Sequence, residues 1–200
     1  MSKIFTACLL LILSVQSFAA ERATFGVRGE RLPVYQLVTF VSDPQETEDD
    51  FVLRVGTFLT RYSQQSGFEA CASLVQRADG RLVANVTSNE SHIGCVAVVT
   101  TEGKETGRSI HSHPESGNVR LNLADNTFLR GDQGRQGNAR RESMRTTGGV
   151  SPTDRLSGSG YLVEKGRVVF FSRNAPDRLV GPIAASPLAP SLLASSAPQE

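Results

Sequence analysis

The 200-residue chain has no tryptophan, only three histidines and three cysteines, and no excess of charge of either sign. Its 21 basic and 20 acidic residues nearly balance. Proteins that bind nucleic acid or anionic lipid through general charge attraction carry a clear basic excess. We therefore expect neither partner. The length suits one domain of ordinary size, and the sequence contains no internal repeat.

Long hydrophobic runs are also missing, except at the start of the chain. Residues 4–15 are almost wholly apolar, follow the basic Lys3, and precede the small-x-small triplet Ser17-Phe18-Ala19. This combination is typical of a secretory signal peptide, and the run is short for a membrane span. We expect residues 1–19 to be cleaved off, leaving a periplasmic or secreted protein with no stable membrane insertion.

The scarcity of cysteine leaves few options. Cys8 lies within the predicted signal peptide, so Cys71 and Cys95 remain in the mature chain. In an oxidising compartment, an even pair of cysteines is typical of a disulfide. Two alternatives stay open: a pair of buried thiols, or Cys71 as a reactive or metal-binding thiolate.

Hydrophobic periodicity predicts a mixture of helix and strand. A helix is expected over residues 46–65, because apolar residues recur at helical spacing and acidic residues crowd its first turn. Alternating or β-branched segments predict strands at 34–41, 69–76, 81–87, 93–101, 108–113, 161–164 and 167–171. This order of elements predicts an α+β or mixed α/β fold.

Two segments show little periodicity. Residues 117–149 are rich in Gly, Arg and Asn, and a segment of this length without structure is usually functional or mobile. We expect a long inserted loop there. After Pro176 the composition turns to Ala, Ser, Pro and Leu, which predicts a disordered low-complexity tail over residues 179–200.

Two of the three histidines stand two residues apart, in Ile110-His111-Ser112-His113-Pro114. A strand directs residues i and i+2 to the same face, so both imidazoles can point at one position. Pro114 cannot donate to a sheet ladder and marks the end of the strand. Two imidazoles and a distant carboxylate can form an open metal site. The alternative is a pair of surface or hydrogen-bonded histidines, and His92 is expected to be an exposed loop residue.

The candidate carboxylate lies in Ser151-Pro152-Thr153-Asp154. A serine cap, a proline at the first helical position and an acid in the first turn predict the start of a helix. A helix cap and a metal ligand can coexist in this segment.

Together these residues resemble the signature of the JAMM family of zinc metallopeptidases, also written JAB/MPN. That signature is a glutamate, then His-x-His-Pro, then Ser-x-x-Asp. The segment Phe68-Glu69-Ala70-Cys71-Ala72 is similar to the family's glutamate strand, and Gly160-Tyr161-Leu162-Val163 is similar to small bacterial members. The resemblance covers about residues 46–172. It implies a single domain over residues 20–178, with a curved β-sheet flanked by helices.

The resemblance also implies the role of each site residue. His111, His113 and Asp154 would bind Zn²⁺ and leave its fourth position to water. Glu69 would be the general base, with Glu90 and Glu115 as rivals on the sequence.

Ser151 would stabilise the oxyanion of the tetrahedral intermediate. The family has a much shorter gap between its histidines and its Ser-x-x-Asp than residues 114–150 provide here. We expect the extra residues to form an active-site flap, since closure entropy rises slowly with loop length.

The function implied is that of an exported zinc metallopeptidase or isopeptidase, acting on a peptide, isopeptide or peptidoglycan-derived substrate. One alternative is a catalytically inactive binding or scaffold module with the same fold. Another is a hydrolase that uses the Cys71 thiol with His113. The insertion or the tail could contact a protein partner.

Overall fold

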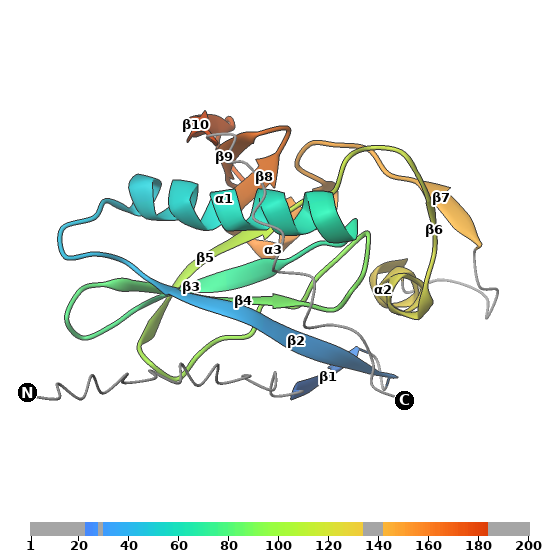
Figure 1. The fold of residues 1–200 in the computed structure, drawn as a ribbon, viewed down its shortest axis with the longest axis horizontal. Coiled ribbons are helices and arrows are strands. Elements are labelled where there is room, and N and C mark those ends of the chain that lie inside the picture. The colour runs from blue at the N-terminus through green and yellow to red at the C-terminus, as the bar shows by residue number, and fades with distance from the viewer. Residues whose placement is uncertain (1–22, 28–29, 134–141, 184–200) are drawn as a thin grey trace, which may run out of the picture.

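The computed structural model describes residues 23–27, 30–133 and 142–183, which form a large mixed β-sheet with helices packed around it (Figure 1). The strands of this sheet are β1 (Ala23–Val27), β2 (Glu30–Val41), β3 (Cys71–Gln76), β4 (Leu82–Ser88), β5 (Lys104–Ser112), β8 (Ser159–Glu164), β9 (Arg167–Phe171) and β10 (Arg178–Pro182). A separate pair of short strands and the helices are β6 (Asn118–Arg120), β7 (Ser143–Arg145), α1 (Glu48–Ser66), α2 (Leu123–Gln133) and α3 (Pro152–Ser157). The predicted α+β class, with a mixed sheet flanked by helices, is confirmed.

The eight strands lie in the order β1-β2-β4-β3-β5-β8-β9-β10. All neighbouring pairs in this order are antiparallel except β5 and β8, which run parallel. The parallel pair requires a long crossover, since no tight turn can join parallel strands. The segment from β6 to α3 supplies that crossover and brings the chain back beside the end of β5.

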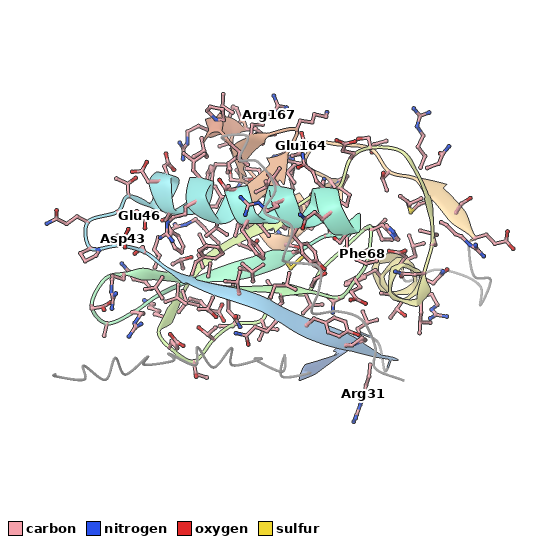
Figure 2. The ribbon with its side chains drawn as sticks, in the orientation of Figure 1. Arg31, Asp43, Glu46, Phe68, Glu164 and Arg167 are labelled. Atoms are coloured by element: carbon pink, nitrogen blue, oxygen red, sulfur yellow. A yellow bond between two sulfur atoms is a disulfide. The ribbon has the colours of Figure 1, made fainter. Side chains whose placement is uncertain are left out.

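Helix α1 packs across the sheet and forms the core together with the strands (Figures 1 and 2). Four of its apolar side chains are fully buried, and burial of each stabilises the fold by about 1.5–3 kcal/mol. They are Phe51, Val52, Val55 and Leu59. Gly56 allows close approach, since a Cβ there would lie 2.9 Å from Cγ2 of Val168. Thr47 caps the helix, and Gly67 ends it in the left-handed conformation, φ 77°.

The two faces of β5 have different environments. Ile110 is part of the core under α1, and Ser112 Oγ shares a 2.6 Å hydrogen bond with Ser63 Oγ on that helix. Since side chains alternate along a strand, His111 and the following His113 are directed to the other face. Cys71 is the cross-strand partner of His111 in the β3–β5 ladder.

The strand predicted over residues 93–101 is wrong. In the structure these residues form no ladder with the sheet. Both edges of β3 are already occupied, by β4 and β5, so this apolar segment cannot pair with β3. A disulfide to Cys71 and a hydrogen bond from Val96 N to Asn89 Oδ1 hold the segment beside the sheet instead.

The prediction of an unstructured insertion over residues 117–149 is also wrong where the structure describes that segment. It contains β6, α2 and β7, and residues 134–141 lie outside the described part. Asn122 caps α2 by accepting from Asp125 N at 2.9 Å, while Asn122 N donates to Asp125 Oδ2 at 2.8 Å. A Cβ built on Gly94 would lie 3.1 Å from Phe128 of α2, so the helix rests closely on the segment after β4.

The ends of the domain differ from the predicted boundaries. Strand β10 pairs with β9, so residues 179–182 belong to the sheet rather than to the predicted tail. The predicted signal peptide, residues 1–19, and the tail residues 184–200 lie outside the described part of the chain. Within the part that the structure describes, no helix combines the length and the apolar character needed to cross a membrane.

Candidate metal centre

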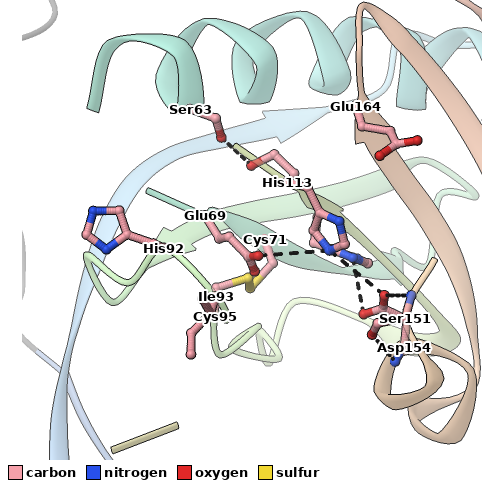
Figure 3. Close-up of polar contacts among 12 residues, drawn as sticks. Ser63, Glu69, Cys71, His92, Ile93, Cys95, His113, Ser151, Asp154 and Glu164 are labelled. Carbon is pink, nitrogen blue, oxygen red and sulfur yellow. Dashed lines mark hydrogen bonds and ion pairs between the residues drawn. A yellow bond between two sulfur atoms is a disulfide. The ribbon is translucent and has the colours of Figure 1, made fainter. Parts of the chain in front are cut away.

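His111, His113 and Asp154 converge at the end of β5. Figure 3 shows His113 beside Asp154. Each offers one ligand atom, and these atoms lie within 4.8 Å of one another. Nε2 of His111 is 3.3 Å from Asp154 Oδ1, and Nε2 of His113 is 3.9 Å from Asp154 Oδ2. The three residues could hold a metal ion, as the sequence predicted.

The histidines are held by the sheet. The ring centroids of His111 and His113 are 5.0 Å apart, and the His111 ring meets the edge of Phe171 at 5.9 Å. The backbone N–H of His113 donates to Val163 O at 3.0 Å, which extends the β5–β8 contact by one residue. The two imidazoles are therefore placed by regular strand structure rather than by a loop.

Asp154 is placed by the capping box of α3. Ser151 Oγ accepts from Asp154 N at 3.1 Å, and Asp154 Oδ2 accepts from Ser151 N at 2.7 Å. The same carboxylate faces His111 with its other oxygen. Both interpretations of Ser151-Pro152-Thr153-Asp154 therefore hold together: this segment starts a helix, and its carboxylate joins the two histidines.

The site contains a buried polar atom that a bound cation would satisfy. Nε2 of His111 is buried and lacks a hydrogen-bond partner among the described residues, and its nearest carboxylate contact is Asp154 Oδ1 at 3.3 Å. Leaving a buried polar atom without a partner costs about 1–3 kcal/mol. A cation bound between the imidazoles and the carboxylate would remove that cost, so the residues present fit a metal ion.

The protonation states also fit metal binding, which needs neutral imidazoles and a charged carboxylate. Burial, reinforced by the nearby His111, lowers the pKa of His113 to about 4, so this ring is neutral at pH 7. Burial alone would raise the pKa of Asp154, but contact with His111 and with Ser151 outweighs it. The pKa of the Asp154 carboxyl therefore lies below its usual range.

Glu69 lies next to the group of three without belonging to it. Its Oε1 is 3.9 Å from Nε2 of His113, and only 6 % of the residue is exposed. Burial, with smaller contributions from the charges of Asp154 and Asp125, raises the pKa of Glu69 well above its ordinary value. A base beside the ligands can hold and release a proton, whereas a ligand could not.

Glu69 contacts the candidate ligand His113, whereas no ion pair of Glu90 or Glu115 with a candidate ligand occurs among the described residues. Glu115 is also exposed. Ser151 is at the site through its partner Asp154, and its Oγ serves as an acceptor in the cap. A hydroxyl that accepts one hydrogen bond can still donate another.

Cys71 and Cys95 form a disulfide, with their Cα atoms 6.0 Å apart, as predicted. Neither sulfur is a free thiol. The structure therefore gives no support to Cys71 as a thiolate, as a metal ligand, or as the nucleophile of a hydrolase with His113.

Sequence reasoning missed one polar pair beside this site. His92, predicted as an exposed loop residue, is partly buried, and its Nδ1 lies 2.8 Å from Asp125 Oδ2. Asp125 is fully buried and also accepts from Ser91 Oγ and from the backbone N–H groups of His92 and Asn122. The pattern Asn122-x-x-Asp125, which matches the cap of α3, was the available signal for α2. No sequence pattern indicated the pairing with His92.

Comparisons of the chain with models of protein families, with curated proteins and with solved structures find no match. The JAMM resemblance therefore depends on the motif residues and their order.

Proposed function

We propose that the protein is an exported zinc-dependent metallopeptidase or isopeptidase of the JAMM type, which hydrolyses an amide bond through an activated water. The observation that carries this proposal is the convergence of His111, His113 and Asp154. These are the residues to which the motif assigns zinc binding. Two imidazole nitrogens and one carboxylate oxygen are a common ligand set of catalytic zinc, and they leave a fourth position open.

The residues around the ligand set have the properties that the reaction needs. Zinc bound there would lower the pKa of a water molecule and polarise the substrate carbonyl. Glu69 would take the proton from that water and deliver it to the leaving amine, and its raised pKa favours carrying a proton between the two. Ser151 would donate a hydrogen bond from its hydroxyl group to the oxyanion of the intermediate.

Export is supported by two observations. The first is the signal-like pattern of residues 1–19. The second is the Cys71–Cys95 disulfide, since disulfides persist mainly in oxidising compartments. An amide in a peptide, an isopeptide or a peptidoglycan fragment is the substrate class that such a location offers. The convergence of three ligand atoms counts against the alternative of an inactive scaffold.

The test is elemental analysis of the purified mature protein beside two variants. We expect about one zinc per chain in the wild type, and loss of zinc in His113→Ala. His92→Gln is the matched control, because His92 is the remaining histidine and lies outside the ligand group; it should keep its zinc. A wild-type protein without affinity for zinc would refute the proposal.

Activity is then measured on a panel of peptides, isopeptides and peptidoglycan fragments. We expect hydrolysis that a chelator abolishes and that zinc restores. A zinc-loaded protein that hydrolyses none of these amides would favour the scaffold alternative.

A further inference from the structure

A cleft of about 630 Å³ opens beside the candidate metal centre. It lies between the end of α1 and the chain that follows β5, and its lining includes Gly67, His92 and Pro114. Pro114 directly follows the candidate ligand His113, and Gly67 is two residues before Glu69. In the view of Figure 3, Glu69 lies between His92 on one side and His113 on the other. Glu69 and His113 do not line the cleft themselves, but residues close to each of them in the chain do. Its volume is within the usual range of small-ligand sites, about 300–1,000 Å³.

His92 lines this cleft, and a hydrogen bond holds its ring. Its Nδ1 faces the fully buried carboxylate of Asp125 at 2.8 Å, so that nitrogen carries the hydrogen and donates it. With Nδ1 engaged by Asp125, Nε2 is the ring nitrogen that remains for a ligand, and an unprotonated Nε2 accepts a hydrogen bond. Four hydrogen bonds converge on Asp125 and hold the ring in this orientation. A histidine that contributed only packing would not require a hydrogen bond from its ring to a buried carboxylate.

The cleft also carries one full charge of each sign. Glu115 and Arg120 both line it, and both are exposed. Among the residues that the structure describes, neither forms an ion pair, with the other or with a third residue. Opposite charges that share a cleft without pairing leave room for a ligand that carries both complementary charges.

The position of the cleft beside Glu69 indicates which half of a substrate it would hold. In amide hydrolysis the water oxygen joins the carbonyl carbon, the C–N bond breaks, and the amine leaves with the proton that Glu69 delivers. The leaving amine must therefore be near Glu69. The acyl half, which keeps the water oxygen, stays at the metal and at Ser151.

We propose that this cleft binds the zwitterionic amino-acid end of the leaving amine, with the ammonium group at Glu115 and His92 Nε2 and the carboxylate at Arg120. The preferred substrate is then an amide on the side-chain amine of a diamino acid whose α-ammonium and α-carboxylate are free. This inference rests on the proposed function for its assignment to the leaving amine. The binding of a zwitterion by the cleft can be measured without any turnover.

The binding test uses free lysine, Nα-acetyl-lysine and lysine amide as probes of the full mature protein, both zinc-free and zinc-loaded. Ring signals of isotopically labelled histidine report on His92 by NMR. Free lysine should shift the His92 signals and should bind at least about tenfold more tightly than either blocked probe, since a lost charged contact costs about 1.4 kcal/mol or more. Equal affinity for the three probes, or an unmoved His92, would overturn the inference.

Variants connect the binding to the residues. His92→Gln, Glu115→Gln and Arg120→Gln should each remove the preference for free lysine. Arg31→Gln is the matched control: Arg31 is an exposed arginine on β2 and points away from the sheet in Figure 2. It should leave both binding and activity unchanged. A melting curve for each variant separates loss of binding from loss of folding.

Turnover then separates the two proposals. With peptides joined to the lysine side-chain amine, the cleft variants should raise KM about tenfold and leave kcat largely intact. Hydrolysis without preference for the free amino-acid end would overturn this inference and leave the proposed function standing. Selective lysine binding by a zinc-loaded protein that hydrolyses nothing would keep the zwitterion site and overturn the proposed function.

Discussion

Nε2 of His111 lies 3.3 Å from Oδ1 of Asp154, although all of β6, α2 and β7 stands between these residues in the chain. The contact depends on two separate local structures. Strand alternation directs His111 away from the core, and the capping box of α3 fixes the Asp154 carboxylate. The crossover between the parallel strands β5 and β8 then brings the two together.

Replacing Asp154 by asparagine separates metal binding from folding. The amide oxygen can still accept from Ser151 N, so α3 should keep its cap and the melting temperature of the metal-free protein should change little. The negative charge is lost, and zinc affinity should fall by at least about 100-fold, beyond the usual effect of changes around the ligands. Competition with a chelator of known affinity measures this. Unchanged zinc affinity would show that Asp154 is not a ligand.

The sequence predicted the local structures that carry the candidate ligands, and the resemblance implied that these ligands meet. The spacing of His111 and His113 is a strand period, and Ser151 with Asp154 is a helix cap. Each pattern determines the structure of a few neighbouring residues only. The proximity of Glu69 was implied by the resemblance, and the pairing of β3 with β5 provides its physical basis.

The errors came from properties that depend on distant parts of the chain. Residues 93–101 are apolar enough for a strand, but whether a strand forms there depends on a free sheet edge, and β4 and β5 leave none on β3. The pairing of His92 with Asp125 joins two segments through polar groups that have no period. Helix α2 has weak apolar periodicity, and it is fixed by its Asn122–Asp125 cap and by contacts with the segment after β4.

Replacing Glu69 by glutamine should strongly reduce activity and should stabilise the metal-free protein at neutral pH. The raised pKa means that folding favours the protonated carboxyl of Glu69. As pH rises above the pKa that Glu69 has in the unfolded chain, this residue therefore lowers the free energy of unfolding. Glutamine carries no charge, so it should raise the free energy of unfolding at pH 7 by about 1–3 kcal/mol. The loss of the base should lower turnover by about 10²–10⁴-fold. Melting temperatures at pH 4 and pH 7 in chelator should show the gain only at pH 7. Zinc content should stay unchanged.

A less stable glutamine variant at pH 7, or one that retains full activity, would contradict this role of Glu69. The surface replacement Glu105→Gln is the matched control, because Glu105 is exposed at the far end of β5. It should change neither stability nor activity.

His113 should make the metal-free protein lose stability in mild acid. The pKa of His113 is about 4 in the folded protein, whereas the ordinary value of 6.5 applies to the unfolded chain. Between these two pH values the unfolded chain therefore binds more protons than the folded protein. Stability attributable to His113 is therefore present above pH 6.5 and is lost as pH falls toward 4. Glu69 acts in the opposite direction, so the comparison is made in the Glu69→Gln background. Adding His113→Gln should flatten the fall in melting temperature over this range; an equally steep fall would contradict the prediction.

The hydroxyl of Ser151 should matter for activity beyond its role as a cap. Ser151→Ala removes the cap, which costs about 0.5–2 kcal/mol, and should reduce kcat about 10²–10³-fold through the lost oxyanion contact. Thr47→Ala is the matched control, because Thr47 caps α1 in the same way, by accepting from Asp50 N. It should cost similar stability and leave kcat unchanged. Equal losses of kcat in the two variants would show that only helix stability is involved, and Ser151→Thr should restore activity.

The Cys71–Cys95 disulfide should stabilise the fold and position the cleft without being needed for metal binding. Replacing both cysteines by alanine opens a covalent loop with a sequence separation of 24, and should cost about 2–4 kcal/mol. Cys95 is three residues beyond His92, so its release loosens the segment that carries the cleft acceptor. His111 and His113 are held by β5 and its neighbours, so zinc binding should persist.

The double variant is expected to melt at lower temperature, to bind zinc normally and to bind free lysine more weakly. Loss of zinc together with lysine binding would instead show that the disulfide supports the metal centre itself.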